Sequence, residues 1–157
     1  MKSSRAAALA IGAVLTAAVT GGSFGPQRPR TAIWYAALRK PPGTPPGPAI
    51  GAAWGVLDVL LCLTGYRLLR REPSRARTAA LACWAGSLAG LAGFPAVFFG
   101  LRRLGPSAAV SAGMFASAGG TALAAASIDS TAALTSLPLV LWTGFATALS
   151  EELWRRN

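Results

Sequence analysis

The sequence predicts an all-α membrane protein: a bundle of five transmembrane helices with a long proline-rich loop between the first and second. Apolar residues make up 53% of the 157 residues and charged residues only 13%, and the mean hydropathy is +0.47. This composition is typical of membrane proteins rather than soluble domains. The charges gather between apolar tracts, five of which are about twenty residues long, enough to span a bilayer. The length predicts one domain, residues 1–157.

The five apolar tracts set the expected helices and the loop. Prolines at the starts of the second and fourth tracts suit a first helical turn, whereas Pro95 and Pro138 fall inside tracts and should kink or interrupt them. The first tract also fits a secretory signal, with a basic start, an apolar middle and small residues after it; the four tracts that follow favour a retained helix. The expected segments are helices at 6–24, 48–69, 78–101, 106–128 and 130–154, with a lid loop at 25–47.

The net charge of +10 raises nucleic acid as a partner, but the fifteen basic residues lie at the ends of apolar tracts, as membrane-flanking anchors do. We therefore expect a membrane partner and no nucleic acid. There is no histidine and there are only five acidic residues, so no metal site, required cofactor or catalytic residue is predicted. Basic residues number seven on one side and eight on the other, which leaves the orientation open.

The expected helices are rich in alanine and glycine. Glycines four residues apart, at Gly51 and Gly55 and at Gly86 and Gly90, allow helix backbones to approach closely. Such contacts form either within the bundle or between two copies of the chain, so a homodimer is a possible outcome.

The five tryptophans divide into two groups. Trp84 and Trp154 lie near the ends of expected helices, where interfacial anchoring explains them. Trp54 and Trp142 fall deeper, where lipid offers the indole N–H no hydrogen-bond partner. These two are therefore candidates for the wall of an internal site.

Asp58 lies well inside the expected helix at 48–69, four residues after Trp54 and on the same face. An ionisable group in a span usually faces the bundle interior or a wet cavity. One interpretation is that Asp58 only bonds a neighbouring donor. The other is that Trp54, Asp58, Trp142 and Phe145 line one pocket.

The lid loop contains two aromatic residues, Trp34 and Tyr35, and five prolines follow them between Pro41 and Pro48. Successive prolines stiffen a chain and remove backbone donors, so this stretch can cover the bundle without regular structure. If it folds back, Trp34 and Tyr35 would close a pocket whose floor is Trp54. The alternative is an interfacial loop whose indole lies among lipid headgroups.

Several short motifs occur in one order along the chain. They are Trp34-Tyr35, Leu38, Lys40-Pro41, Pro45-Pro46, Gly51, Trp54, Phe98-Phe99-Gly100-Leu101, Arg103-Leu104, Pro138, Trp142, Phe145-Ala146-Thr147, Leu149 and Asn157. Together they resemble the TspO/MBR family of tryptophan-rich sensory proteins and translocator proteins. The resemblance runs from about residue 34 to the end, while the first tract matches only in hydropathy and position.

This resemblance implies a five-helix bundle, commonly a homodimer, whose first loop covers a pocket for porphyrins such as protoporphyrin IX or a heme-like molecule. It implies the ligand-binding positions Trp34, Tyr35, Trp54, Trp142, Phe145 and Ala146, to which the residue pattern adds Asp58. The chain departs from the family at Asp58, where a tyrosine is usual, and at Gly90 and Gly93, which replace an asparagine and a tryptophan. These changes predict a roomier pocket with altered ligand choice.

Three functions follow from the resemblance. The first is a ligand-binding sensory or regulatory protein for porphyrins or similar flat hydrophobic molecules. The second is a transporter of porphyrin-like or lipidic molecules, and the third is light- or oxygen-dependent porphyrin degradation, which leaves enzymatic activity open. High alanine, glycine and arginine usage indicates a GC-rich bacterial source and hence a bacterial cell membrane.

Overall fold

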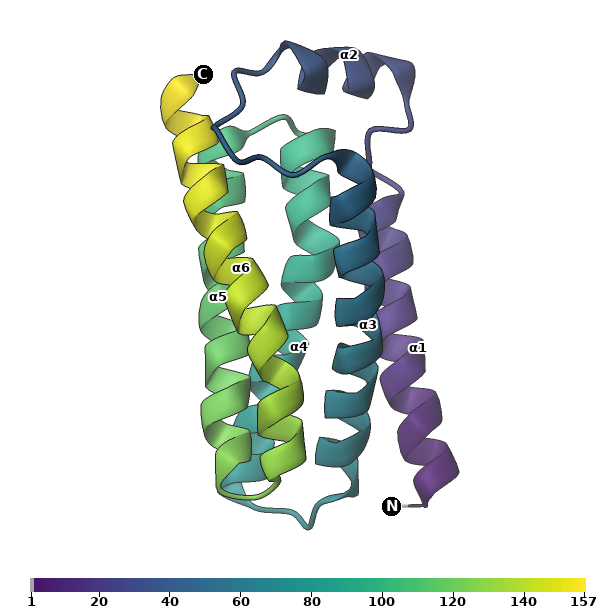
Figure 1. Cartoon of the computed structure of the whole chain (residues 1–157). Coiled ribbons are helices and arrows are strands. Elements are labelled where there is room, and N and C mark those ends of the chain that lie inside the picture. Colours follow the sequence, from purple (N-terminus) through teal and green to yellow (C-terminus); the bar gives the residue numbers. More distant parts are fainter. Residues whose placement is uncertain (1) are drawn as a thin grey trace.

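The computed structural model describes residues 2–157, which are helical over most of their length (Figure 1). Five of the helices are long and apolar enough to cross a membrane, which confirms the predicted fold class. The elements are α1 (Ser3–Gly22), α2 (Pro29–Ala37), α3 (Gly47–Arg70), α4 (Arg75–Pro95), the π-helix η1 (Ala96–Gly100), α5 (Leu104–Ala126) and α6 (Ser130–Arg156).

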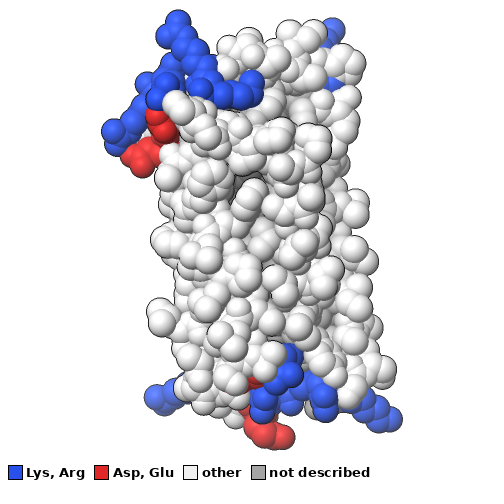
Figure 2. Space-filling model, viewed as in Figure 1, with Lys and Arg blue, Asp and Glu red and all other residues white. Residues whose placement is uncertain are grey.

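The five long helices form a closed ring in the order α1, α3, α6, α5, α4 (Figure 1). Helix α2 lies across one end of this bundle, and the α3–α4 and α5–α6 connections lie at the other. Figure 2 shows the charged side chains at these two ends, with an uncharged band between them. This distribution suits a bilayer, because charged groups stay in water while the band faces hydrocarbon.

Helix α1 is an integral part of the bundle. Its buried residues, which recur every three or four positions along one face, are Ala6, Ala10, Val14, Ala17 and Gly21. Gly21 lies so close to α4 that a Cβ there would be 2.5 Å from the Leu91 carbonyl oxygen. This packing favours a retained helix over the secretory signal as the interpretation of the first tract.

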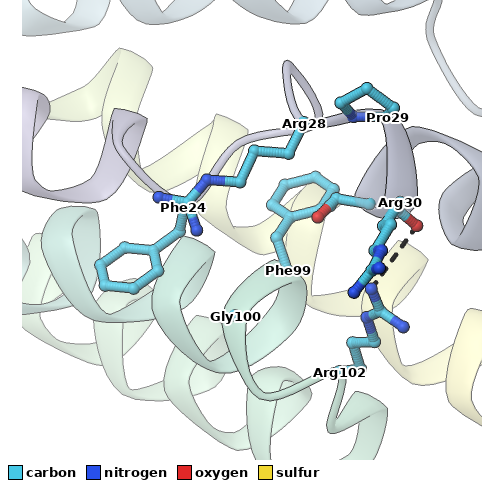
Figure 3. Close-up of a pocket in the computed structure, with 8 residues that line it drawn as sticks. Phe24, Arg28, Pro29, Arg30, Phe99, Gly100 and Arg102 are labelled. Carbon is cyan, nitrogen blue, oxygen red and sulfur yellow. Dashed lines mark hydrogen bonds between the residues drawn. The ribbon is translucent and has the colours of Figure 1, made fainter.

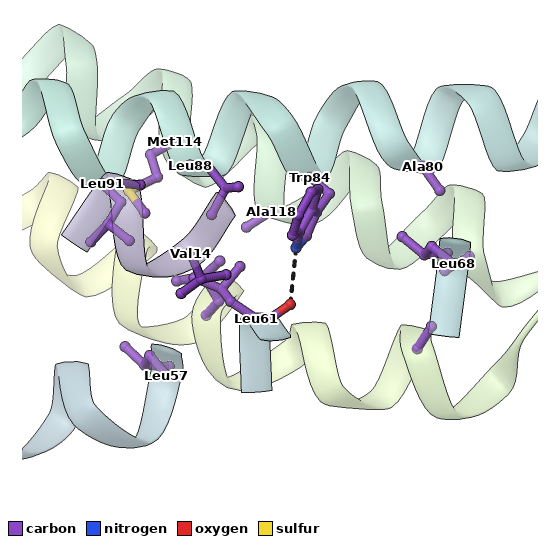
Figure 4. Packing of buried hydrophobic residues seen from close by; sticks show 14 residues of the cluster. Val14, Leu57, Leu61, Leu68, Ala80, Trp84, Leu88, Leu91, Met114 and Ala118 are labelled. Carbon is purple, nitrogen blue, oxygen red and sulfur yellow. Dashed lines mark hydrogen bonds between the residues drawn. The ribbon is translucent and has the colours of Figure 1, made fainter. Parts of the chain in front are cut away.

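Trp84 lies in the core, so the prediction that it anchors the chain at the membrane interface is wrong. Its side chain is 7% exposed, and its indole N–H donates to the Leu61 carbonyl oxygen at 3.0 Å (Figure 4). The indole fits because α3 has glycine at position 65, where any Cβ would clash with the ring. The distance of Trp84 from the end of its helix could not predict this burial, because the packing of a side chain depends on the neighbouring helix.

The two predicted glycine pairs have different roles. Cβ atoms at Gly86 and Gly90 would lie 2.6 Å from Ser117 Oγ and 2.8 Å from Met114 Cβ, so this pair lets α4 and α5 approach within the chain. Cβ atoms at Gly51 and Gly55 would meet nothing within 4 Å. The bundle itself therefore does not require that second pair to be glycine.

At the end of the bundle opposite α2, Asp129 connects α3 to α6. Its carboxylate accepts the backbone N–H of Ala132 at 3.0 Å, which caps α6, and pairs with Arg67 at 2.9 Å and Arg71 at 2.7 Å. Burial alone would raise the pKa of Asp129, but the hydrogen bonds from Arg67, Ala132 and Arg71 outweigh burial and lower it to about 2. The carboxylate therefore stays ionised and holds the two helix ends together.

Prolines shape the ends of two other segments. Helix α4 ends at Pro95 and continues as η1, the irregularity predicted there, whereas Pro138 lies inside a continuous α6. The lid loop contains a helix that was not predicted, α2, which starts at Pro29. A proline in the first turn loses no backbone hydrogen bond, so it favours a helix start there. The stretch from Pro41 to Pro46 has no helix, as expected.

Candidate ligand-binding site

Hydrogen bonds join the lid loop, just after α2, to the end of α6. The backbone N–H of Arg39 donates to Asn157 Oδ1 at 2.9 Å, and Asn157 Nδ2 donates back to the Arg39 carbonyl oxygen at 3.3 Å. Asn157 Nδ2 also donates to the Leu153 carbonyl oxygen at 2.8 Å. Because one amide bonds both segments, it fixes where the loop returns toward the bundle after α2.

Trp34 and Tyr35, on α2, pack onto the aromatic residues of η1. Their ring centroids lie 5.5 Å and 6.0 Å from that of Phe98, and Tyr35 is also 5.6 Å from Phe99. Lys40 Nζ lies 4.5 Å from the Tyr35 ring centroid, a cation–π contact. Burial raises the pKa of Tyr35, so its phenol remains neutral at physiological pH. This aromatic layer holds α2 against the bundle.

Trp54 and Trp142 meet between α3 and α6. Their ring centroids are 6.4 Å apart in an edge-to-face arrangement, and Trp142 lies 5.9 Å from Phe145. Ala146, the next residue, is half-buried. Asp58 lies one turn along α3 from Trp54, and its Oδ1 is buried without a hydrogen-bond partner among the described residues.

The predicted site residues thus fall into two groups. Trp34 and Tyr35 are joined through η1, and Trp54, Trp142 and Phe145 are joined across α3 and α6. Between residues 2 and 157, no aromatic contact links the two groups. That they line one pocket remains a prediction.

A cavity of about 550 Å³ lies beneath the start of α2 (Figure 3). Its walls come from the end of α1, the first residues of α2 and the end of η1, so it adjoins the aromatic layer. Neither tryptophan of the second group lines it. The residues that line it are Phe24, Arg28, Pro29, Arg30, Thr31, Phe99, Gly100 and Arg102.

The cavity combines aromatic surface with positive charge. Three arginines line it and no acidic residue does, while Phe24 and Phe99 supply flat apolar surface. Guanidinium groups bind carboxylates through paired hydrogen bonds, and aromatic faces suit planar ligands. The volume lies in the range of small-molecule sites. The arrangement can therefore bind a flat molecule that carries acidic groups.

Arg102 connects the cavity to the aromatic layer. Its guanidinium donates to the Arg30 carbonyl oxygen at 3.5 Å (Figure 3) and lies 5.7 Å from the Trp34 ring centroid. Its φ of 55° is in the left-handed region, which residues other than glycine seldom adopt. Such strain persists only where surrounding contacts hold it, and it concentrates at ligand sites.

The sequence did not single out the residues of this cavity. Its arginines were interpreted as membrane anchors, since they lie at the ends of apolar tracts. The sequence does not show that the segment after α1 and the segment after η1 meet at one place. Gly100 matters for shape, since a Cβ there would lie 2.9 Å from Phe24 Cδ1. In the sequence, the motif around Phe99 and Gly100 that the chain shares with the family could have indicated these residues, but it was not assigned to the ligand site.

Comparison with known proteins is consistent with this architecture. The model of the TspO/MBR family matches residues 9–155, nearly the whole chain. The chain belongs to the TspO/MBR family. Protein CrtK of Rhodobacter capsulatus is 32% identical over 143 residues, which are 90% of this chain and 86% of that protein.

Other relatives carry two kinds of name. The translocator protein of Ovis aries is 31% identical over 144 residues, covering 87% of this chain and 83% of that protein. The tryptophan-rich sensory protein of Cereibacter sphaeroides is 33% identical over 124 residues, covering 79% and 77%. The chain is thus a multi-pass integral membrane protein of the TspO translocator and sensory type.

Proposed function

We propose that this TspO/MBR protein binds a flat hydrophobic molecule with carboxylate groups, such as protoporphyrin IX or a heme-like porphyrin, in a bacterial cell membrane. The observation that carries the proposal is the cavity beneath α2, about 550 Å³, with three arginines and two phenylalanines in its walls. The porphyrin ring lies against Phe24 and Phe99, and its carboxylates bind the arginines. Binding where the residues after α1, the start of α2 and η1 meet suits a sensory or regulatory role.

The test compares two porphyrins that have the same ring but differ in the charge of their side chains. Protoporphyrin IX and its dimethyl ester are titrated into the protein in detergent, and quenching of tryptophan fluorescence is measured. We expect the free acid to bind about tenfold more tightly, the equivalent of one carboxylate–arginine pair at roughly 1.4 kcal/mol. Equal affinity for the acid and the ester would contradict the proposal.

Arginine variants locate the binding site. Arg28→Gln should reduce the preference for the free acid, because it removes a cavity guanidinium. Arg156→Gln is the matched control: it lies near the C-terminus at the same end of the bundle, pairs with Glu152 and does not line the cavity. The control should retain the parent preference, and equal effects of both changes would indicate a general attraction to positive charge.

Tryptophan variants separate this site from the one predicted between α3 and α6. Trp34 adjoins the cavity through Arg102, whereas Trp142 packs on Trp54. Trp34→Phe should weaken porphyrin binding and Trp142→Phe should leave its dissociation constant unchanged. The reverse result would place the ligand between α3 and α6.

We also propose that the protein forms a homodimer through the exposed glycines of α3. Glycine inside a helix costs about 1 kcal/mol relative to alanine, and the bundle gives no reason for it at Gly51 or Gly55. A close contact with a second copy supplies that reason. Gly51→Leu with Gly55→Leu should convert the protein to a monomer in light scattering, and Ala82→Leu, on the exposed face of α4, should not.

A further inference from the structure

A second charged cavity lies at the end of the bundle opposite α2. Its volume is about 210 Å³, and its walls are Tyr66, Arg67, Arg70, Arg71 and Asp129. Three guanidinium groups against one carboxylate leave two positive charges in a small space. One water molecule takes about 30 Å³ in the liquid, so the cavity has room for the four oxygens of a phosphate group.

The arginines are only partly used by the protein. Arg67 and Arg71 bond Asp129, yet their side chains remain 32% and 45% exposed. Arg70 bonds only the Tyr66 hydroxyl, at 3.0 Å, one turn away on the same helix. Arg70 therefore keeps most of its five N–H donors for another acceptor. By contrast, the exposed arginines near the C-terminus, Arg155 and Arg156, each pair with a glutamate of their own helix.

The position of the cavity across the membrane indicates which anion binds there. Arg67 and Arg70 lie in the last turn of α3, where a transmembrane helix leaves the hydrocarbon and meets the lipid phosphates. Figure 2 shows charged side chains at this end directly below the uncharged band. A bound phosphate at this depth belongs to a lipid whose chains extend along the bundle.

An apolar stripe continues from the cavity along α3. Val56, Val59 and Leu63 are 62%, 67% and 39% exposed, and they precede Tyr66 and Arg70 at intervals of three and four residues. These intervals place all five on one face of the helix. Acyl chains packed on this stripe bring their headgroup to the cavity.

We propose that the cavity at the end of α3 is a binding site for one anionic phospholipid. The lipid phosphate bonds Arg70 and the free donors of Arg67, and its acyl chains lie along Val59 and Leu63. The net positive charge selects lipids with a net negative headgroup over zwitterionic ones. The bound lipid occupies the part of this α3 face that follows Gly55, beyond the proposed glycine contact between two copies, and the site is independent of the porphyrin cavity.

The test measures lipid retention by native mass spectrometry and thermal unfolding in detergent. Three probes are added: phosphatidylglycerol, phosphatidylcholine and glycerol 1-phosphate. We expect saturable binding and stabilisation by phosphatidylglycerol, about tenfold weaker binding of phosphatidylcholine, and no effect of glycerol 1-phosphate at the same concentration. Equal binding of the two lipids would overturn the anionic selectivity. Equal stabilisation by glycerol 1-phosphate would show a site for a free phosphate ester instead.

Variants separate the site from general charge attraction. Arg70→Gln should weaken phosphatidylglycerol binding about tenfold, whereas Arg75→Gln, at the same end but outside the cavity, should change it less than twofold. Leu63→Ser tests the stripe without altering charge and should also weaken binding. Equal effects of Arg70→Gln and Arg75→Gln, or parent-like binding by both Arg70→Gln and Leu63→Ser, would refute the proposal.

Discussion

Replacing Asp129 by asparagine tests how the end of the bundle is held together. The change keeps the size of the side chain and an acceptor for the cap of α6, but it removes the charge that Arg67 and Arg71 bond. The two arginines would then lie side by side without a counter-ion. We therefore expect the helix ends of α3 and α6 to separate more easily in Asp129→Asn.

The size of the effect follows from the pKa of Asp129. Its fall from 3.8 to about 2 corresponds to roughly 2–3 kcal/mol of stability before screening, at 1.36 kcal/mol for each unit. The carboxylate itself is buried, but the arginines are 32% and 45% exposed, so solvent screens part of the attraction and we keep the estimate at about 2 kcal/mol. For a chain of this length, this predicts a melting temperature roughly 4–8 °C lower.

Acid should abolish the difference. Because the folded pKa is depressed, the stabilisation is complete above the unfolded pKa of 3.8 and is lost as the pH falls through about 2. Thermal unfolding of parent and Asp129→Asn in detergent should therefore differ at pH 7, and the difference should shrink below pH 4 and vanish below about pH 2. Glu151→Gln, which breaks an exposed pair with Arg155, is the control and should cost less than about 0.5 kcal/mol. Equal melting of parent and Asp129→Asn at pH 7 would refute the reasoning.

Three further changes test other contacts. Asn157→Ala removes both hydrogen bonds to Arg39, so the lid loop should become more sensitive to protease while the melting temperature changes little; unchanged cleavage would contradict the tether. Gly65→Ala places a methyl group against the Trp84 ring and should destabilise the bundle by about 1–3 kcal/mol in thermal unfolding; parent-like melting would show that the Trp84 ring is not held by this contact. Asp58→Asn removes an acid whose Oδ1 has no partner, so it should melt at the parent temperature or above; a lower melting temperature would show that Asp58 stabilises the bundle.

Hydropathy predicted the five spans because a bilayer requires long uncharged helices, and the order of residues along the chain is enough to show them. The irregular turn after Pro95 was predictable for a similar reason, since a proline removes a backbone donor wherever it lies. The position of Trp84 was not predictable in this way. Its indole reaches the Leu61 carbonyl only because Gly65 leaves space on the neighbouring helix, and that contact depends on how α3 and α4 are rotated.

The candidate site was harder to predict than the fold. Trp34 and Tyr35 were identified as a cover, but their partners, Phe98 and Phe99, lie in a π-helix whose geometry turns both rings toward α2. Two arginines of the cavity, Arg28 and Arg102, lie outside the helices and more than seventy residues apart in the sequence. Position in the sequence shows that such residues lie at a membrane surface, but only the folded chain shows that they converge.

The charges of this TspO/MBR protein also favour one orientation of the proposed porphyrin. Cavity arginines attract carboxylates at the end of the bundle that carries α2. Asp58 lies eleven residues into α3 from Gly47, about 16 Å further along the helix. Beyond Trp54, α3 presents the carboxyl group of Asp58 and no basic residue before Arg67, so a ligand carboxylate that moved inward would be buried without a counter-ion. The acidic edge of the porphyrin therefore remains beneath α2 and the apolar edge points into the bundle, so charge alone selects the orientation of a nearly symmetrical ring.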